Sequence, residues 1–146
     1  MTLSGKSNIN PKIWGPYIWK TIHFVAHGYP ENPNDEDKQA YRDFYRNIMK
    51  VLPCDKCSIS SQELFIKSNL NHSLNSKEDL IKWAYTFHDS VNNKLGKTSP
   101  SFEDYTNTIT LSNTGFDYTF ITIILICTSL LLIFLLFQRH PYKYLD

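Results

Sequence analysis

The chain has 146 residues, which suits one compact domain, and its 15 Lys and Arg residues nearly balance its 14 Asp and Glu residues. The net charge of +1 leaves no broad cationic field, which excludes an electrostatic nucleic-acid binder, and a hydrophobic content of 42% excludes a disordered chain. Seven Pro, five Gly and three Cys residues exclude the collagen-like and disulfide-dense secreted classes.

The first half of the chain shows the helical period, with apolar residues three and four positions apart. A first helix over residues 13–26 would bury Trp19, Ile22, His23 and Ala26. A Gly-Tyr-Pro turn at residues 28–30 ends it, and Asn34 and Asp35 can cap a second helix that Pro53 stops. The buried face of this second helix would be Tyr41, Phe44, Tyr45, Ile48 and Leu52.

Two further helices are expected after the Pro53 stop. The third starts near Asp55 and runs through Leu64, Phe65 and Leu70. The fourth begins after Ser76, with Asp79 completing an acidic variant of the capping box. Its apolar stripe is Leu80, Trp83, Ala84, Phe87, His88, Val91 and Leu95. The sequence therefore predicts an all-α fold, a small four-helix bundle with room for a short fifth helix. The aromatic rings inside it either fill a small core or line a cofactor site, and the pattern by itself favours the core.

The C-terminal third differs sharply from the bundle. Residues 118–137 contain no charged side chain, and twenty helical residues span about 30 Å, the thickness of a bilayer core. We therefore predict a domain over residues 1–105, a polar tether over 106–117, a transmembrane helix over 118–137 and a short basic tail over 138–146. The N-terminus has no stretch that would serve as a signal peptide, so we expect the domain to face the cytosol. The positive tail argues for the opposite orientation, but so short a tail is easily translocated.

Cys54 and Cys57 form a CxxC motif at the expected start of the third helix. A helix N-terminus lowers a thiol pKa, Pro53 fits a helix start and Lys56 adds positive charge, so the motif suits a redox-active dithiol. Three interpretations compete. A thioredoxin-like domain would need a preceding strand, where the pattern is helical. A zinc site would combine the cysteines with His23 and His27. The third interpretation is a disulfide that exchanges electrons with a flavin.

Three motifs together resemble the Erv/ALR family of FAD-dependent sulfhydryl oxidases, which are helical bundles. Trp19 and His23 match a WxxxH segment, which YPENP follows at residues 29–33. The PCDKC segment at residues 53–57 resembles the family's PCxxC active site. Residues 83–97 resemble its W…HNxVNxxLxK flavin segment. The motifs follow the family's order and cover about residues 12–97.

The resemblance implies roles for individual residues. Cys57 would contact the reactive edge of the flavin, and Cys54 would accept electrons from a substrate dithiol through a mixed disulfide. The FAD site would be formed by Trp19, His23, Cys57, His88, Asp89, Val91, Asn92, Leu95 and Lys97, with no metal. Molecular oxygen would accept the electrons and give hydrogen peroxide, and the chain would form a homodimer through its first two helices.

The sequence departs from the family pattern at several positions. Asp89 replaces the usual Asn and loses an amide donor, and Pro16 lies where many members carry an Arg. There is no second CxxC, and Cys127 lies within the predicted span, so electrons would come from a separate dithiol carrier. These features resemble the viral branch of the family, in large DNA viruses that assemble in the cytoplasm. They imply a role in virion disulfide formation, in the host cytoplasm and the virion membrane.

Two functions of other classes stay open on the sequence. One is a membrane-tethered helical adaptor in which the CxxC holds zinc or merely packs. The other is a thiol carrier without a cofactor. The sequence does not show whether Tyr105, just past the predicted bundle, reaches the flavin.

Overall fold

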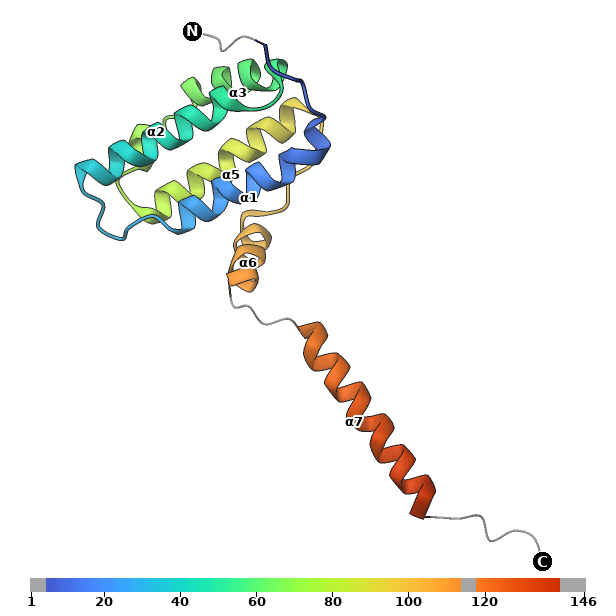
Figure 1. Ribbon diagram of the computed structural model, residues 1–146. Helices are drawn as coiled ribbons and strands as arrows, with labels where there is room; N and C mark the ends of the chain where they lie inside the picture. The colour runs from blue at the N-terminus through green and yellow to red at the C-terminus, as the bar shows by residue number, and fades with distance from the viewer. Residues whose placement is uncertain (1–4, 114–117, 140–146) are drawn as a thin grey trace, which may run out of the picture. The chain divides into compact units, whose positions relative to one another are not determined.

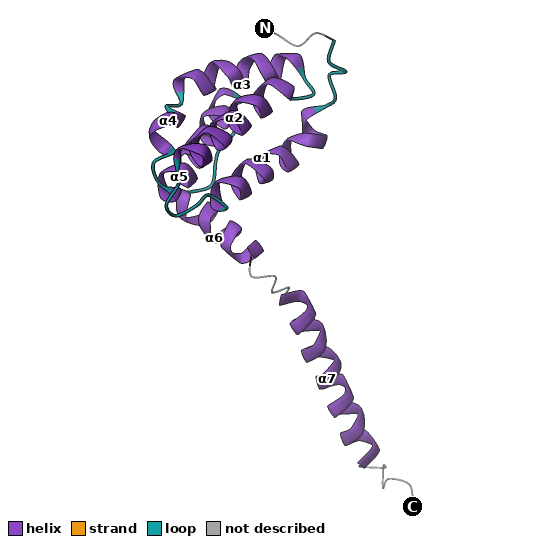
Figure 2. Ribbon diagram, turned by 60° about the vertical axis from the view of Figure 1, so that its left-hand side comes forward, coloured by secondary structure: helices purple, strands orange, loops and turns teal. Residues whose placement is uncertain are grey.

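The computed structural model describes residues 5–113 and 118–139, and within these ranges all regular structure is helical (Figure 2). This confirms the predicted all-α class. The chain consists of two compact units, residues 1–109 and residues 110–146. The four predicted helices form the bundle of the first unit. In it, α1 (Pro11–His27) lies beside α5 (Lys77–Lys94), and α2 (Asp35–Val51) lies beside α3 (Asp55–Lys67) (Figure 1).

The helix boundaries follow from local capping. Helix α1 (Pro11–His27) starts where the Asn10 side chain accepts a hydrogen bond from the Lys12 N–H. Helix α2 (Asp35–Val51) has a full capping box between Asn34 and Asp37. Helix α5 (Lys77–Lys94) starts at Ser76, whose Oγ accepts from the Asp79 N–H. Each of these starts lies within two residues of its prediction.

The third predicted helix is shorter than expected. Helix α3 (Asp55–Lys67) ends before Ser68, and Leu70 begins a separate single turn, α4 (Leu70–Ser73). The break is at Asn69, whose φ of 51° is left-handed and incompatible with a continuous helix. The change of direction lets Leu70 bury its side chain in the core.

The core lies between α1, α2, α4 and α5 and contains most of the predicted inner faces. Ile22, Ala26, Tyr45 and Leu80 are almost completely buried. Leu95 was expected to continue the stripe of α5 but is 62% exposed, because the helix has already ended at Lys94. Met49, which the sequence pattern did not single out, is buried beside them.

A further helix, α6 (Phe102–Asn113), covers most of the segment expected to be a tether from residue 106. Ser101 accepts from the Asp104 N–H and so caps the first turn, while Tyr105 and Ile109 are buried within the first unit. These anchors explain why the Ser- and Thr-rich segment is helical. Residues 114–117 of the predicted tether lie outside the described residues.

The second unit contains α7 (Tyr118–Arg139). Its segment Thr119–Gln138 has a mean hydropathy of 3.0. By length and composition this helix could span a membrane. The predicted basic tail lies outside the described residues from 140 onward.

Candidate active site

Cys54 and Cys57 are joined by a disulfide at the N-terminus of α3, with their Cα atoms 5.2 Å apart. Cys54 is the N-cap residue, and its Sγ accepts a hydrogen bond of 3.2 Å from the Cys57 N–H. Both residues are half-buried. The positive end of the α3 dipole therefore faces the sulfur atoms, which favours a thiolate when the disulfide is reduced.

The N-terminal segment binds the turn that carries this disulfide, an arrangement the sequence did not reveal. The Ile9 N–H donates to the Pro53 carbonyl at 2.9 Å, and the Asp55 N–H donates to Asn8 Oδ1 at 3.0 Å. Asn8 has a φ of 49°, a conformation that Asn tolerates better than most residues. The turn is thus held on both sides of Cys54 by residues about 45 positions away.

A cluster of flat rings joins α1 to α5. The indole of Trp19 stacks on the imidazole of His88, with centroids 3.8 Å apart and an interplanar angle of 9°. His23 Nε2 lies 2.9 Å from His88 Nδ1. Three of the residues predicted to bind a cofactor are therefore in direct contact, although the two helices are far apart in the sequence.

Both histidines of this pair are neutral at pH 7. Burial lowers the pKa of His23 to about 3, with smaller contributions from His88 and His27. Burial also lowers the pKa of His88 to about 4, an effect that Asp89 opposes and Lys97 reinforces. A neutral imidazole has one donor and one acceptor nitrogen, so the N–H of one ring donates a hydrogen bond to the bare nitrogen of the other. The pair forms an uncharged, hydrogen-bonded surface.

Tyr105 of α6 completes the cluster from a third helix. Its ring lies 4.6 Å from that of His23, its hydroxyl lies 3.4 Å from His27 Nε2, and it is only 7% exposed. Burial raises the pKa of Tyr105, so the hydroxyl stays protonated. Neither Tyr105 nor His27 was among the predicted site residues. The spacing of Phe102, Tyr105 and Ile109 is helical and would have indicated a buried face here.

Further rings connect this cluster to the helix that carries the disulfide. Phe87 lies 6.0 Å from Trp19 and stacks on Trp83 at 5.3 Å, with an interplanar angle of 7°. Phe65 of α3 meets both Trp83 and Phe87 edge-on at about 6 Å. Trp83 and Phe87 belonged to the predicted apolar stripe but not to the predicted site. They form a continuous aromatic layer from α1 through α5 to α3.

The remaining predicted residues lie near the end of α5. Asp89 accepts a hydrogen bond from the Asn93 side chain, and the Asn92 side chain donates to Ser99 Oγ, both at 3.0 Å. Val91 packs against the core, whereas Leu95 is exposed. Lys97 is also exposed, yet close enough to His88 to affect the pKa of that imidazole. The structure thus groups Trp19, His23 and His88 tightly and leaves Leu95 apart from them.

Two buried polar atoms in this region, His23 Nδ1 and Trp83 Nε1, have no hydrogen-bond partner among the described residues. Such atoms are rare because an unpaired buried polar group costs free energy. A flat heteroaromatic group with polar edges would stack on the rings of this site and would also form hydrogen bonds with ring nitrogens that lack a partner. The residues present therefore fit a flavin cofactor.

The zinc interpretation finds less support in the geometry. His23 contacts His88, and the two cysteines are bonded to each other. In the described ranges, no group of three or more His, Cys, Asp or Glu side chains is placed to hold a metal ion. The structure does not assemble the predicted set of two cysteines with His23 and His27.

Comparison with known proteins agrees with a site that fits a flavin cofactor. Residues 16–110 match the model of the Erv1/Alr family. The chain is 42% identical over 90 residues to a probable FAD-linked sulfhydryl oxidase of Acanthamoeba polyphaga mimivirus, a match that covers 61% of this chain and 63% of that protein. It is 32% identical over 94 residues to an FAD-linked sulfhydryl oxidase of African swine fever virus, covering 64% of this chain and 77% of the viral protein.

The fold agrees with a solved structure as well. The crystal structure of the FAD binding domain of Erv1 from Saccharomyces cerevisiae superposes with a TM-score of 0.60 at 27% identity, covering 66% of this chain and 90% of that domain. The family match covers well over half of the chain, from within α1 to within α6, and includes the cysteine and histidine motifs. The chain belongs to the Erv1/Alr family.

Proposed function

We propose that this protein is an FAD-linked thiol oxidase that forms disulfides in partner proteins. The observation that carries the proposal is the layer of aromatic rings between the Cys54–Cys57 disulfide helix and the neutral His23–His88 pair. It connects the helix that carries the cysteine pair to a site that suits a flat cofactor. The names of the viral relatives, FAD-linked sulfhydryl oxidases, support this activity.

The cysteine pair would exchange thiols with the substrate in two balanced steps. A substrate thiolate attacks Cys54 Sγ and forms a mixed disulfide, while Cys57 leaves as a thiolate. The second substrate thiol, once deprotonated, attacks the substrate sulfur of this mixed disulfide and releases Cys54. The substrate gains a disulfide, and the enzyme gains two electrons as a dithiol. The N-terminus of α3 and Lys56 favour the Cys57 thiolate.

Trp19, His23 and His88 would hold FAD, with Lys97 toward its phosphates and Asp89, Val91, Asn92 and Leu95 around the same end of α5. When bound, FAD supplies two-electron chemistry between the cysteine pair and molecular oxygen, with hydrogen peroxide as the product. The uncharged histidine pair offers one donor or acceptor nitrogen to the cofactor at His23 Nδ1. Trp83 Nε1 offers a second donor.

The cellular setting belongs to the same proposal. The helix α7 would anchor the protein in a membrane, with the catalytic unit on the cytosolic side. Relatives from large DNA viruses support a role in virion disulfide formation, with a small dithiol carrier as the electron donor. Exposed apolar side chains on one face of α1, at Ile13, Tyr17 and Phe24, support a homodimer.

A visible absorption spectrum of the purified full chain in detergent, before and after addition of dithiothreitol, tests the activity. We expect a flavin spectrum that bleaches on reduction and recovers as oxygen is consumed. A folded, colourless protein that cannot be reconstituted with FAD would overturn the proposal.

A further inference from the structure

A groove of about 410 Å³ lies between α2, α3 and α4, outside the candidate cofactor site. Phe65 and the buried Leu70 form its apolar floor, and Ile66, which is 83% exposed, stands at its side. The wall on α2 carries Arg42, Arg46 and Lys50. An apolar floor beside a cationic wall is typical of a surface that binds a partner and is not typical of core packing.

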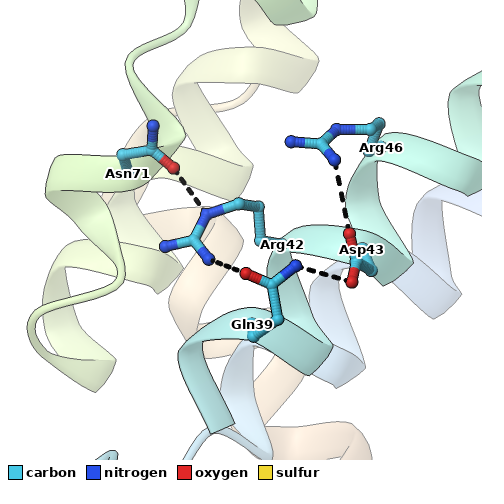
Figure 3. Close-up of polar contacts among 5 residues, drawn as sticks. All are labelled: Gln39, Arg42, Asp43, Arg46 and Asn71. Carbon is cyan, nitrogen blue, oxygen red and sulfur yellow. Dashed lines mark hydrogen bonds and ion pairs between the residues drawn. The ribbon is translucent and has the colours of Figure 1, made fainter. Parts of the chain in front are cut away.

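The three basic residues form a ridge, because residues four apart lie on the same face of a helix. This ridge extends for about 12 Å along α2. Arg42 is held in place between two other residues, as Figure 3 shows. Its Nη1 donates to Gln39 Oε1 at 2.6 Å, and its Nε donates to Asn71 Oδ1 of α4 at 2.7 Å. Both acceptors are neutral amides, so they orient the guanidinium without cancelling its charge.

Among the described side chains that contact the ridge, one is a carboxylate. Asp43 lies 3.4 Å from Arg46 Nη1 and also accepts a hydrogen bond of 2.7 Å from Gln39 (Figure 3). This ion pair is exposed, and such pairs contribute little. No Asp or Glu is among the described residues that line the groove. The groove therefore has an excess of positive charge next to an apolar surface.

One end of the groove reaches the redox-active turn. Lys50 lies in the last turn of α2, four positions before Cys54, and its carbonyl accepts a hydrogen bond of 3.1 Å from Ser58 Oγ. Ser58 follows Cys57 directly, and its carbonyl accepts from the side chain of Gln62, which lines the groove. A segment bound along the ridge would therefore extend toward the disulfide.

We propose that this groove docks the dithiol substrate protein, through a segment that combines carboxylate side chains with an apolar anchor. The inference rests on the proposed thiol oxidase function. The carboxylates would pair with Arg46 and Lys50, Arg42 would offer its remaining N–H groups, and the anchor would rest on Phe65 and Leu70. Docking there positions the substrate thiolate for attack on Cys54 Sγ, with Cys57 as the leaving thiolate.

Two synthetic dithiol peptides test this proposal with the FAD-loaded full chain. They share a Cys-x-x-Cys segment and an arm with one Leu, and differ only in whether the arm carries four Glu or four Lys. The measured quantity is kcat/KM from oxygen consumption, with dithiothreitol as an uncharged reference substrate. We expect a preference for the Glu peptide of about fivefold at low salt, which shrinks as the ionic strength rises.

A charge reversal distinguishes the effect of the groove on peptide preference from the effect of the protein's overall charge. The variant Arg46→Glu/Lys50→Glu is expected to prefer the Lys peptide while it oxidises dithiothreitol at the wild-type rate. The matched control, Lys12→Glu/Lys82→Glu, makes the same change of charge on exposed residues elsewhere and should keep the wild-type preference. If the reversed variant loses its flavin absorption through misfolding, the milder Arg46→Gln/Lys50→Gln variant replaces it and should abolish the preference.

The outcomes distinguish the two proposals. A wild-type chain that oxidises dithiothreitol but treats the two peptides alike overturns the docking site and leaves the oxidase intact. So does a preference that survives in the groove variant or is lost in the control. A wild-type chain that binds no FAD and oxidises no dithiothreitol contradicts the oxidase function itself.

Discussion

His23 on α1 and His88 on α5 lie 2.9 Å apart, Nε2 to Nδ1, in a pair that links two helices across 65 positions of the sequence. Because His88 also stacks on Trp19, each of the three side chains constrains the orientation of the others. The pair stays neutral because it is buried, and this neutrality has a measurable consequence.

The first prediction concerns the pH dependence of stability. Each imidazole binds a proton near pH 6.5 in the unfolded chain but only near pH 3 to 4 in the folded one. The unfolded state therefore binds more protons in this window, so stability falls as the pH is lowered from about 7 to about 4. Thermal unfolding should show a Tm several degrees lower at pH 5 than at pH 7.5. A His23→Gln/His88→Gln variant should show a flatter profile, and an equally steep one would contradict the assignment.

The second prediction assigns electron transfer to the cysteine pair. Cys57→Ser should retain flavin absorption, because the ring cluster proposed to hold the cofactor is unchanged. It should lose dithiothreitol oxidation, because a serine hydroxyl forms neither a thiolate nor a disulfide. Oxygen consumption measures the loss. Cys127→Ser serves as the control and should turn over at the wild-type rate. Normal turnover in the Cys57 variant would exclude the mechanism.

The third prediction tests Tyr105 as a structural part of the site. Replacement by Ala removes a buried ring that packs on His23 and should cost about 3–5 kcal/mol of unfolding free energy. Tyr105→Phe keeps the ring and loses only the long contact with His27, so its cost should be about 1 kcal/mol or less. Urea denaturation of the full chain, followed by circular dichroism, separates the two. Equal costs for both variants would contradict a packing role.

The fourth prediction concerns the contact of Asn8 with the redox-active turn. Asn8→Gly removes the acceptor of the Asp55 N–H, keeps a residue that adopts a φ of 49° without strain and should cost about 1 kcal/mol, a value typical of a lost hydrogen bond. The freed turn should be reduced faster by dithiothreitol, which stopped-flow flavin bleaching reports. Asn10→Ala removes the cap of α1 at a similar cost and should leave this rate unchanged. Equal rates in both variants would show that the Asn8 contact does not restrain the disulfide.

The local elements of this protein could be read from its sequence because they depend on interactions over three or four residues. The N-caps at Asn34 and Ser76, the stop at Pro53 and the period of Trp19, Ile22, His23 and Ala26 all act within one or two helical turns. The CxxC pair is local in the same sense, since residues three apart at a helix start are already close enough to form a disulfide.

Contacts between distant segments were decided only by the tertiary structure. No local rule brings His88 to His23 and Trp19, places Asn8 against Asp55, or shows that Tyr105 closes over the histidines. The same applies to Asn69, where the gain from burying Leu70 outweighs the cost of a left-handed residue and breaks the third helix. The sequence by itself determined α1, α2 and α5, the start of α3, the apolar C-terminal segment and the position of the CxxC pair. Packing between helices determined which rings meet at His23 and His88 and which amide group contacts the turn that carries the disulfide, because such contacts depend on how the helix faces meet in space.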